Sequence, residues 1–233
     1  MYSRTLVSFP EHENTRILEH PNTSFFFLIF AAMSAPKPTR IAILASGGGS
    51  NARKIIEYFA ENPAAEVVLL ASNNSQSGIF TFGPESDLPC VHLSKEQHRD
   101  ADFLLGLFKA YKIDLIILAG YLKLIPSKLI EAFPRHILNI HPSLLPKFGG
   151  KGMYGMRVHE AVIASEEFRS GITIHFVNEV YDEGEILMQK ALMIDENWDP
   201  QTLQKEVQKL EHQYFPKAIE KVCLRLQQEK NNV

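Results

Sequence analysis

Residues 40–51 read R-I-A-I-L-A-S-G-G-G-S-N, an apolar run followed by three consecutive glycines. The run at 40–45 is short and continuous, which predicts a buried strand. From Asn51 onward, apolar side chains recur at helical spacing, at Ala52, Ile55, Ile56 and Phe59. A buried strand, a glycine turn and a helix in direct succession predict the first unit of an α/β fold.

The same alternation of strand and helix continues through the first two thirds of the chain, which predicts a parallel sheet. The later strands, at 172–177 and 185–194, are joined by a turn and can add an antiparallel edge. We therefore expect a single-domain, Rossmann-like open sheet, mostly parallel with an antiparallel C-terminal part, and helices on both faces. The other predicted strands are 66–71, 91–93 and 114–119, and the other predicted helices are 96–111, 127–132, 157–165 and a long one that starts at Asp199-Pro200.

The first residues differ in character from the rest of the 233-residue chain. The run F-F-F-L-I-F-A-A at 25–32 is too short to span a bilayer, and acidic residues precede it, unlike in a signal peptide. We expect residues 1–39 to be a disordered or mis-extended N-terminal segment and residues 40–230 to form the functional domain. An unusual export or membrane segment is the alternative for residues 1–32.

Composition excludes several classes of function. The net charge is −3 and there is no dense run of Lys or Arg, which argues against nucleic acid as a partner. Cys90 and Cys223 lie far apart and form no CxxC pattern, so neither a disulfide framework nor a zinc site is expected. We therefore expect a reducing, cytoplasmic location and no membrane association.

The glycine turn resembles several phosphate-binding loops. Gly47, Gly49 and Ala52 fit the dinucleotide pattern G-x-G-x-x-A, but no acidic residue follows the second strand to hold a ribose. The loop also lacks the lysine of a Walker motif. Because a helix N-terminus suits an anion, a single phosphate is the better prediction. A turn that binds no ligand is the alternative.

A second candidate site is N-I-H-P at 139–142. Asn139 and His141 are two apart in a predicted strand, so both side chains project from one face. Pro142 ends the strand, which places the pair at its carboxyl end, where open α/β sheets bind ligands. An Asn amide can stabilise an oxyanion and a His can move a proton near neutral pH. A purely structural hydrogen-bonded pair is the alternative.

A third candidate is Asp182, in the stretch V-Y-D-E-G-E at 180–185. Gly184 predicts a turn that aims the preceding side chains. An aspartate beside a histidine holds the imidazolium and raises the pKa of the ring. The alternative is a turn aspartate that bonds its own backbone.

Together, in this order, the stretches S-G-G-G-S-N, N-I-H-P-S-L-L-P and G-I-T-I-H-F-V-N-E-V-Y-D-E-G resemble the folate-dependent formyltransferases. The resemblance extends from about residue 40 to about residue 225 of the printed sequence. The glycine loop is most similar to that of the branch whose acceptor is a ribonucleotide. That resemblance implies transfer of the formyl group of 10-formyltetrahydrofolate to the amine of 5′-phosphoribosylglycinamide, in purine synthesis.

The resemblance also implies roles for individual residues. Asn139, His141 and Asp182 match the catalytic trio of the family. The phosphate of the ribonucleotide is expected at Gly48, Gly49, Ser50 and Asn51, and the rest of that substrate at Gln208 and Glu211. The folate is expected against Tyr121, Leu122, Lys123, Leu124 and Ile125 and under a loop made by Asn178, Glu179, Val180 and Tyr181.

Further expectations concern cofactors and assembly. The folate is a co-substrate, and no metal or prosthetic group is expected, because the nine histidines show no H-E-x-x-H spacing. We expect a monomer or weak homodimer. Two departures from the family pattern occur: the segment after Pro146 is longer, and Arg157 stands where a histidine is expected, with His159 the better match. The alternatives are a formyltetrahydrofolate hydrolase, a methionyl-tRNA formyltransferase and a non-catalytic phosphate sensor.

Overall fold

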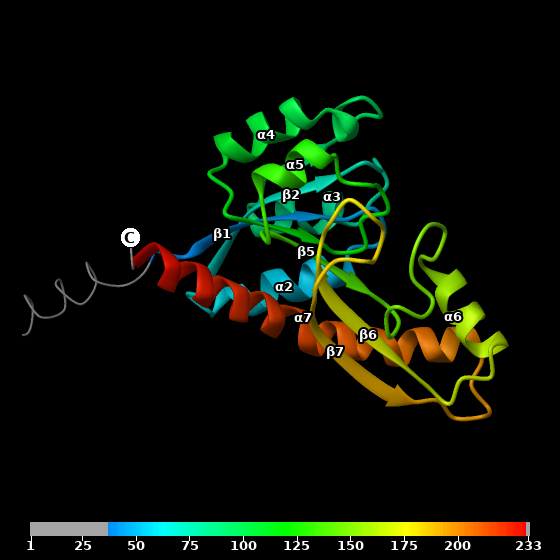
Figure 1. Cartoon of the computed structure of the whole chain (residues 1–233). Coiled ribbons are helices and arrows are strands. Elements are labelled where there is room, and N and C mark those ends of the chain that lie inside the picture. The colour runs from blue at the N-terminus through cyan, green and yellow to red at the C-terminus, as the bar shows by residue number, and fades with distance from the viewer. Residues whose placement is uncertain (1–36, 232–233) are drawn as a thin grey trace, which may run out of the picture. The chain divides into compact units, whose positions relative to one another are not determined.

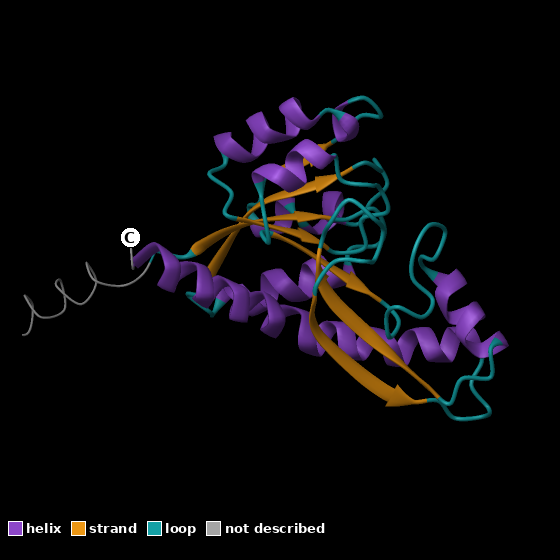
Figure 2. Ribbon diagram, in the orientation of Figure 1, coloured by secondary structure: helices purple, strands orange, loops and turns teal. Residues whose placement is uncertain are grey.

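The computed structural model describes residues 37–231. The expectations for the N-terminal segment therefore lie, up to residue 36, outside the described residues. Seven strands form one sheet in the order β3-β2-β1-β4-β5-β6-β7. Figure 2 draws the strands in orange, with helices around them. The strands are β1 (Thr39–Leu44), β2 (Ala65–Ser72), β3 (Cys90–His92), β4 (Leu115–Leu118), β5 (Ile137–His141), β6 (Arg169–Phe176) and β7 (Ile186–Met193).

The first five strands are parallel, and β6 and β7 run antiparallel to their neighbours. The helices are α2 (Ser50–Ala60), α3 (Ile79–Phe82), α4 (Ala101–Ala110), α5 (Ser127–Ala132), α6 (Met156–Ala164) and α7 (Pro200–Asn231). Helices α4 and α5 lie on one side of the sheet, and α2 and α7 lie on the other (Figure 1). The predicted fold class is confirmed.

Alternation along the central strand explains the two layers of core. In β1, Ile41 and Ile43 pack toward α2 and α7, while Ala42 and Leu44 pack toward α4 and α5. All four side chains are fully buried. A central parallel strand covered on both faces must be apolar at every position, which accounts for the continuous run that marks it in the sequence.

Pairing register brings the ends of several strands to one edge of the sheet. Leu44 of β1 is level with Leu118 of β4, and Leu118 is level with Asn139 of β5. The order of the strands reverses between β1 and β4, because β2 and β3 lie on one side of β1 and β4 and β5 on the other. Such a switch point opens a crevice at the carboxyl ends of the strands. The glycine turn and the N-I-H-P stretch both lead into it.

The largest error in a predicted boundary lies at the start of a helix, and the strand predicted at 172–177 begins three residues earlier, at Arg169. The helix expected at 96–111 begins only at Ala101, after a short 3₁₀ turn at Gln97–Arg99. Asp100 is its N-cap, because the Asp100 carboxylate accepts hydrogen bonds from the backbone N–H groups of Asp102 and Phe103. Among residues 37–231, no helix combines the length and apolar character needed to cross a membrane.

Candidate active site

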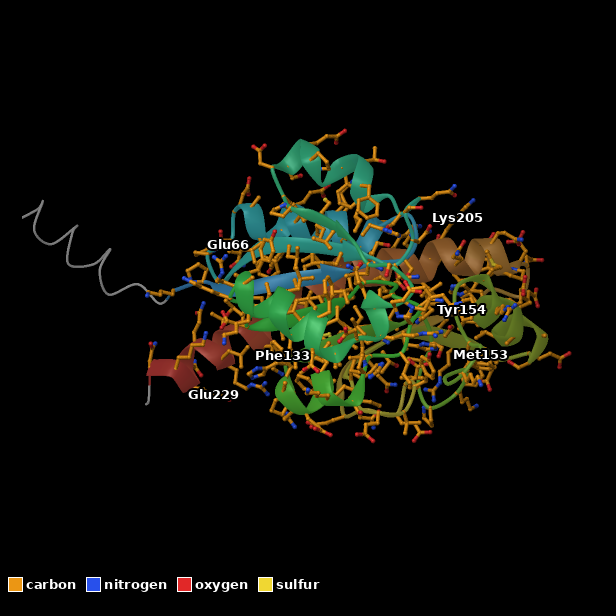
Figure 3. The ribbon with its side chains drawn as sticks, turned by 90° about the horizontal axis from the view of Figure 1, so that it is seen from above. Glu66, Phe133, Met153, Tyr154, Lys205 and Glu229 are labelled. Carbon is orange, nitrogen blue, oxygen red and sulfur yellow. The ribbon has the colours of Figure 1, made fainter. Side chains whose placement is uncertain are left out.

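A cleft of about 550 Å³ lies at the carboxyl edge of the sheet. Its walls come from the ends of β4 and β5, the glycine turn before α2, the loop between β6 and β7, and α7. Segment 150–155, which leads into α6, closes one side. Figure 3 labels Met153 and Tyr154 in this segment, and they lie at the opposite end of the described part from Glu66 and Glu229.

Asn139 and His141 reach the cleft from the last residues of β5. The strand ends at His141, and Pro142 follows. Since Leu138 and Ile140 point into the core toward α2 and α7, the alternating Asn139 and His141 face the other way. The imidazole of His141 is buried, and its Nε2 lies 2.8 Å from the carbonyl oxygen of Phe148. A carbonyl oxygen can only accept a hydrogen bond, so Nε2 of His141 carries a proton. In the neutral ring, Nδ1 then carries no proton, and it faces Asp182.

Asp182 joins them from the loop between β6 and β7. Its Oδ2 is 3.4 Å from His141 Nδ1, and its Oδ1 is 3.4 Å from Asn139 Nδ2. The backbone N–H of Gly150 donates to Oδ2 at 2.9 Å and fixes the carboxylate. The Asp182 backbone is left-handed, with φ of 59°. The structure thus brings the three predicted side chains together in the cleft.

Gly184 makes this loop possible. A Cβ atom at that position would lie 1.6 Å from the carbonyl oxygen of Phe176, so no larger residue fits without moving the backbone. The glycine packs directly against β6 two residues after Asp182. Close packing here holds the carboxylate in its position beside His141.

The charges of the pair follow from burial and partners. Burial pushes the pKa of Asp182 up, but the neighbouring His175 and His141 rings and the Gly150 N–H together outweigh it and lower that pKa. Burial lowers the pKa of His141, although Asp182 and the Phe148 carbonyl oppose the shift. Asp182 raises the pKa of His141 as expected, but desolvation of the ring outweighs the attraction of the carboxylate, so the net shift is downward. At neutral pH the free site holds a carboxylate and a neutral imidazole.

The predicted phosphate loop forms the N-terminus of α2. Gly49 is its N-cap with φ of 75°, and a Cβ atom there would lie 2.9 Å from the Phe82 ring. Asn51 lines the cleft, whereas Gly48, Gly49 and Ser50 are not among the lining residues, and Gly47 is. The first turn of α2 contains no acidic residue, so its free N–H groups keep their attraction for an anion.

Gln208 and Glu211 meet this loop from α7. Gln208 donates a hydrogen bond to Ser50 Oγ at 3.0 Å, and Asn51 donates to Glu211 Oε2 at 2.7 Å. Burial raises the pKa of Glu211, and the bond from Asn51 opposes that rise. Both α7 side chains line the cleft. The structure thus brings this predicted pair to the glycine loop.

The segment predicted to hold the folate lines the same cleft. All five residues of 121–125 line it, as do Asn178, Val180 and Tyr181. Glu179 instead lines a neighbouring cavity of about 660 Å³. The backbone N–H of Leu122 donates to Ser46 Oγ at 3.0 Å, which ties this segment to the strand end before the glycine turn. Burial raises the pKa of Tyr121 to about 12, so its hydroxyl stays protonated.

Sequence reasoning missed several groups of the site. His175 lies opposite Asn139 on β6, and its Nε2 is 3.1 Å from Asn139 Nδ2. The backbone of Phe148 and Gly150 contacts the trio from the segment after Pro146, which is longer than the family pattern. The period-two pattern that predicts β6 already puts His175 on one face with Thr173, but the strand register across from Asn139 is not visible in the sequence. The pair Gly149-Gly150 was the only signal for the close backbone approach.

The two departures from the family pattern also lie at the cleft. Arg157 lines it and stacks over the Tyr154 ring, with Cζ 5.1 Å from the ring centroid. His159 lines it as well, but is 3% exposed, and burial lowers the pKa of His159 to about 4. Among the described residues, no group of three or more His, Cys, Asp or Glu side chains is arranged to hold a metal ion.

Comparison with known proteins agrees with this geometry. The family model described as "Formyl transferase" matches residues 39–219. The chain belongs to the formyl transferase family. The resemblance drawn from the motifs is thereby confirmed, and the match covers every strand and the cleft residues named above.

Several relatives within the formyl transferase family are named phosphoribosylglycinamide formyltransferase. The chain is 42% identical over 194 residues to the chloroplastic phosphoribosylglycinamide formyltransferase of Arabidopsis thaliana. The aligned part covers 81% of this chain and 66% of that protein. It is 33% identical over 188 residues to phosphoribosylglycinamide formyltransferase of Bacillus subtilis, covering 78% of this chain and 94% of that one. The chain spans less than two thirds of the Vigna unguiculata relative, at 61% of its length.

Solved structures of formyl transferases have the same fold. Glycinamide ribonucleotide transformylase 1 of Symbiobacterium toebii superposes with a TM-score of 0.74 at 29% identity, covering 81% of this chain and 89% of that one. Phosphoribosylglycinamide formyltransferase of Brucella melitensis superposes with a TM-score of 0.72 at 32% identity, covering 80% and 96%.

Proposed function

We propose that this protein transfers the formyl group of 10-formyltetrahydrofolate to the amine of 5′-phosphoribosylglycinamide. One observation carries the proposal: the amide of Asn139, the imidazole of His141 and the carboxylate of Asp182 converge within 3.4 Å contacts in one cleft. The same cleft is lined by Asn51 at the N-terminus of α2 and by segment 121–125. The names of the relatives in Arabidopsis thaliana and Bacillus subtilis support the same reaction.

The two substrates would bind at two different segments that line the cleft, the N-terminus of α2 and segment 121–125. The phosphate of the ribonucleotide would lie on the backbone N–H groups of α2 at Gly49 to Asn51, because a helix N-terminus attracts an anion. Gln208 and Glu211 would bond the hydroxyls and amide beyond it. The pterin ring would lie against residues 121–125, with the loop 178–181 over it. This arrangement directs the amine and the formyl group toward the trio.

The reaction forms one C–N bond and breaks another. The neutral amine attacks the formyl carbon. The carbonyl oxygen becomes an oxyanion, which accepts a hydrogen bond from an N–H group of the Asn139 amide. The amine then gives a proton to the His141–Asp182 pair, at Nδ1 of the neutral ring, and the carboxylate at 3.4 Å stabilises the imidazolium. The C–N10 bond breaks, the pair returns the proton to N10, and the products are the formylated amine and tetrahydrofolate.

Rough magnitudes fit such a site. An oxyanion donor contributes about 10²–10³ in rate and a general acid–base group about 10²–10⁴. Holding the amine against the formyl group can supply an effective concentration of about 10⁵–10⁸ M. Proximity is therefore the largest factor, and no metal or prosthetic group enters any of these steps.

An acceptor comparison tests this function. The protein is incubated with 10-formyl-5,8-dideazafolate and, in separate reactions, with 5′-phosphoribosylglycinamide, methionyl-tRNA or no acceptor, while the folate absorbance is followed. We expect deformylation only with 5′-phosphoribosylglycinamide. Equal rates without an acceptor would instead identify a hydrolase, a rate that requires methionyl-tRNA would identify the tRNA enzyme, and no reaction at all would leave a phosphate sensor.

We also propose a reducing compartment such as the cytoplasm, and action as a monomer or weak homodimer on small molecules alone. Support for the compartment comes from Cys90 and Cys223, which are both free thiols. Cys223 is fully buried, and burial raises the pKa of its thiol to about 12. A thiol held in this form is unreactive toward disulfide exchange.

A further inference from the structure

We propose that His175 is a positioning residue that orients the side-chain amide of Asn139, so that the amide offers an N–H group and not its carbonyl oxygen to the reacting formyl group. This inference deepens the proposed function and rests on it. His175 lines the cleft but does not belong to the predicted trio, and the roles given to the trio do not explain why it is there. Its contacts, however, determine which end of the Asn139 amide faces the reaction.

The two residues are paired by strand register. Asn139 of β5 is directly opposite His175 of the antiparallel strand β6. The ring of His175 is 2% exposed and lines the cleft beside the trio. Its Nε2 is 3.1 Å from Asn139 Nδ2, which is a hydrogen-bond distance. A second contact joins Nε2 to Asp182 Oδ1 at 3.6 Å.

The backbone decides which ring nitrogen of His175 carries the proton. Nδ1 lies 3.0 Å from the carbonyl oxygen of Phe176, and a carbonyl oxygen can only accept. Nδ1 must therefore donate, and in the neutral ring Nε2 is left with a lone pair. Asn139 can satisfy that lone pair only with an N–H group of Nδ2.

Asp182 favours the same orientation of the amide. Asn139 Nδ2 is 3.4 Å from Asp182 Oδ1, so the second N–H group of the amide has a carboxylate neighbour. If the amide turned over, its oxygen would face two acceptors, the Nε2 lone pair and the carboxylate. With His175 in place, the first N–H group is anchored and the second remains available for an oxyanion, since its present contact is long.

Removal of the Nε2 acceptor would leave the amide held only by its long contact with Asp182, so that it could turn over. An amide oxygen directed at the developing oxyanion would repel it, so the cost would appear in the transition state and not in substrate binding. We therefore expect kcat to fall while both KM values stay nearly constant. A role limited to packing β5 against β6 would lower stability instead.

Two substitutions separate the two ring nitrogens. An asparagine at position 175 has its amide where Nδ1 lies and ends one atom short of Nε2, so His175→Asn keeps a donor for Phe176 but loses the acceptor for Asn139. A glutamine reaches the place of Nε2, so His175→Gln keeps the acceptor for Asn139 and loses the donor for Phe176. The pair is matched in chemistry and differs only in which contact survives.

The test measures kcat and both KM values by the folate absorbance assay, with melting temperatures as the check on folding. We expect His175→Asn to lower kcat about tenfold to a hundredfold, part of the value of an oxyanion donor, with KM changed less than about twofold. His175→Gln should keep kcat within about threefold of the unsubstituted protein. In an Asn139→Ala background, His175→Asn should have no further effect on kcat, because the amide that it orients is gone.

A spectroscopic measurement stands independently of activity. Long-range ¹H–¹⁵N spectra of the full chain labelled at histidine report which ring nitrogen bears the proton. We expect His175 to have a protonated Nδ1 and an unprotonated Nε2. A protonated Nε2 would overturn the inference even if no formyl transfer occurs, so it can fail separately from the proposed function. In the kinetic experiment, an unchanged kcat in His175→Asn, equal losses in both variants or additive losses with Asn139→Ala would overturn it.

Discussion

At the scale of single residues, the site depends on which atoms bear protons. His141 is neutral, with Nε2 bonded to a backbone carbonyl and Nδ1 facing a carboxylate. Asp182 is ionised and accepts a hydrogen bond from the Gly150 N–H, with one nitrogen of His141 and one of His175 close by. A carboxylate beside a ring that can accept and return a proton suits the acyl transfer between two nitrogens that we propose.

The trio gives the first prediction. Asn139→Ala should lower kcat about 10²–10³-fold and Asp182→Asn about 10²–10⁴-fold, because each removes a transition-state interaction. Steady-state kinetics at saturating substrates measure both. Asn197→Ala, in an exposed turn, serves as the control and should leave kcat unchanged. Near-normal kcat in both trio variants, with folding intact, would refute the assigned roles.

The second prediction concerns stability at low pH. The pKa of His159 is about 4 in the folded chain and about 6.5 when exposed. The shift comes first from burial and then from the nearby His141. Below pH 6.5 the unfolded chain therefore binds a proton at His159, whereas His159 in the folded chain stays neutral until the pH approaches 4. The free energy of unfolding therefore decreases as the pH falls toward 4. A shift of this size corresponds to about 3 kcal/mol.

His159→Gln isolates this contribution. Urea unfolding at several pH values should show that the variant loses less stability between pH 6.5 and pH 4 than the unsubstituted chain does, by about 3 kcal/mol at most. The other titrating groups are common to both chains and cancel in the difference. Parallel stability curves for the two chains over this range would contradict the prediction.

Residues of the candidate site could be predicted from the sequence where they belong to a short motif. Asn139 and His141 were predicted to share a face because strand alternation is a local rule, and the structure has them on one face in the cleft. The protonation of His141 was not predictable, because it depends on burial by residues distant in the chain. His175 was missed for the same reason, since only the pairing of β5 with β6 brings it to Asn139.

At the scale of elements, turns hold the reactive groups in place. The N-terminus of α2 depends on Gly49, whose left-handed backbone and contact with Phe82 leave no room for a side chain. The loop that carries Asp182 depends on Gly184 for another reason, because a side chain there would overlap the backbone carbonyl oxygen of Phe176. Periodicity predicted most strands and helices well, because it reports which face is buried. It placed the start of α4 too early, because capping by Asp100 and not periodicity sets that boundary.

Gly49→Ala gives the third prediction. The added Cβ would lie 2.9 Å from the Phe82 ring on a backbone with φ of 75°, so the free energy of unfolding should fall. A non-glycine residue in such a conformation costs about 1–3 kcal/mol. Gly48→Ala places the same methyl group in open space and is the matched control. Equal unfolding midpoints in urea for the two variants would count against a required turn.

Gly184→Ala gives the fourth prediction. Because the added Cβ would overlap the carbonyl oxygen of Phe176, the loop must move and carry Asp182 away from His141. A displacement of about 1 Å can cost about 10²-fold in rate, so kcat should fall by at least that factor. Gly106→Ala, a helical position with open space around it, should leave kcat unchanged. Normal kcat in Gly184→Ala would show that the loop position does not matter.

At the scale of the whole molecule, the fold assembles one cleft from segments that are far apart in the chain. The glycine turn, the end of β5, the loop before β7 and α7 all reach the carboxyl edge of one sheet. Strand order and register bring them there, and neither can be read from local sequence. The motifs predicted which chemical groups each segment contributes, and the topology brings these segments into one cleft.

The most direct measurement of this convergence follows the formyl carbon itself. The protein is incubated with 5′-phosphoribosylglycinamide and a 10-formylfolate labelled with ¹³C in the formyl group, and the products are analysed by mass spectrometry. We predict that the label is recovered on the amine of the ribonucleotide, and that Asn139→Ala and Asp182→Asn each suppress this transfer. Label recovered as free formate, or retained on the folate, would contradict the central claim that this cleft joins the two substrates for formyl transfer.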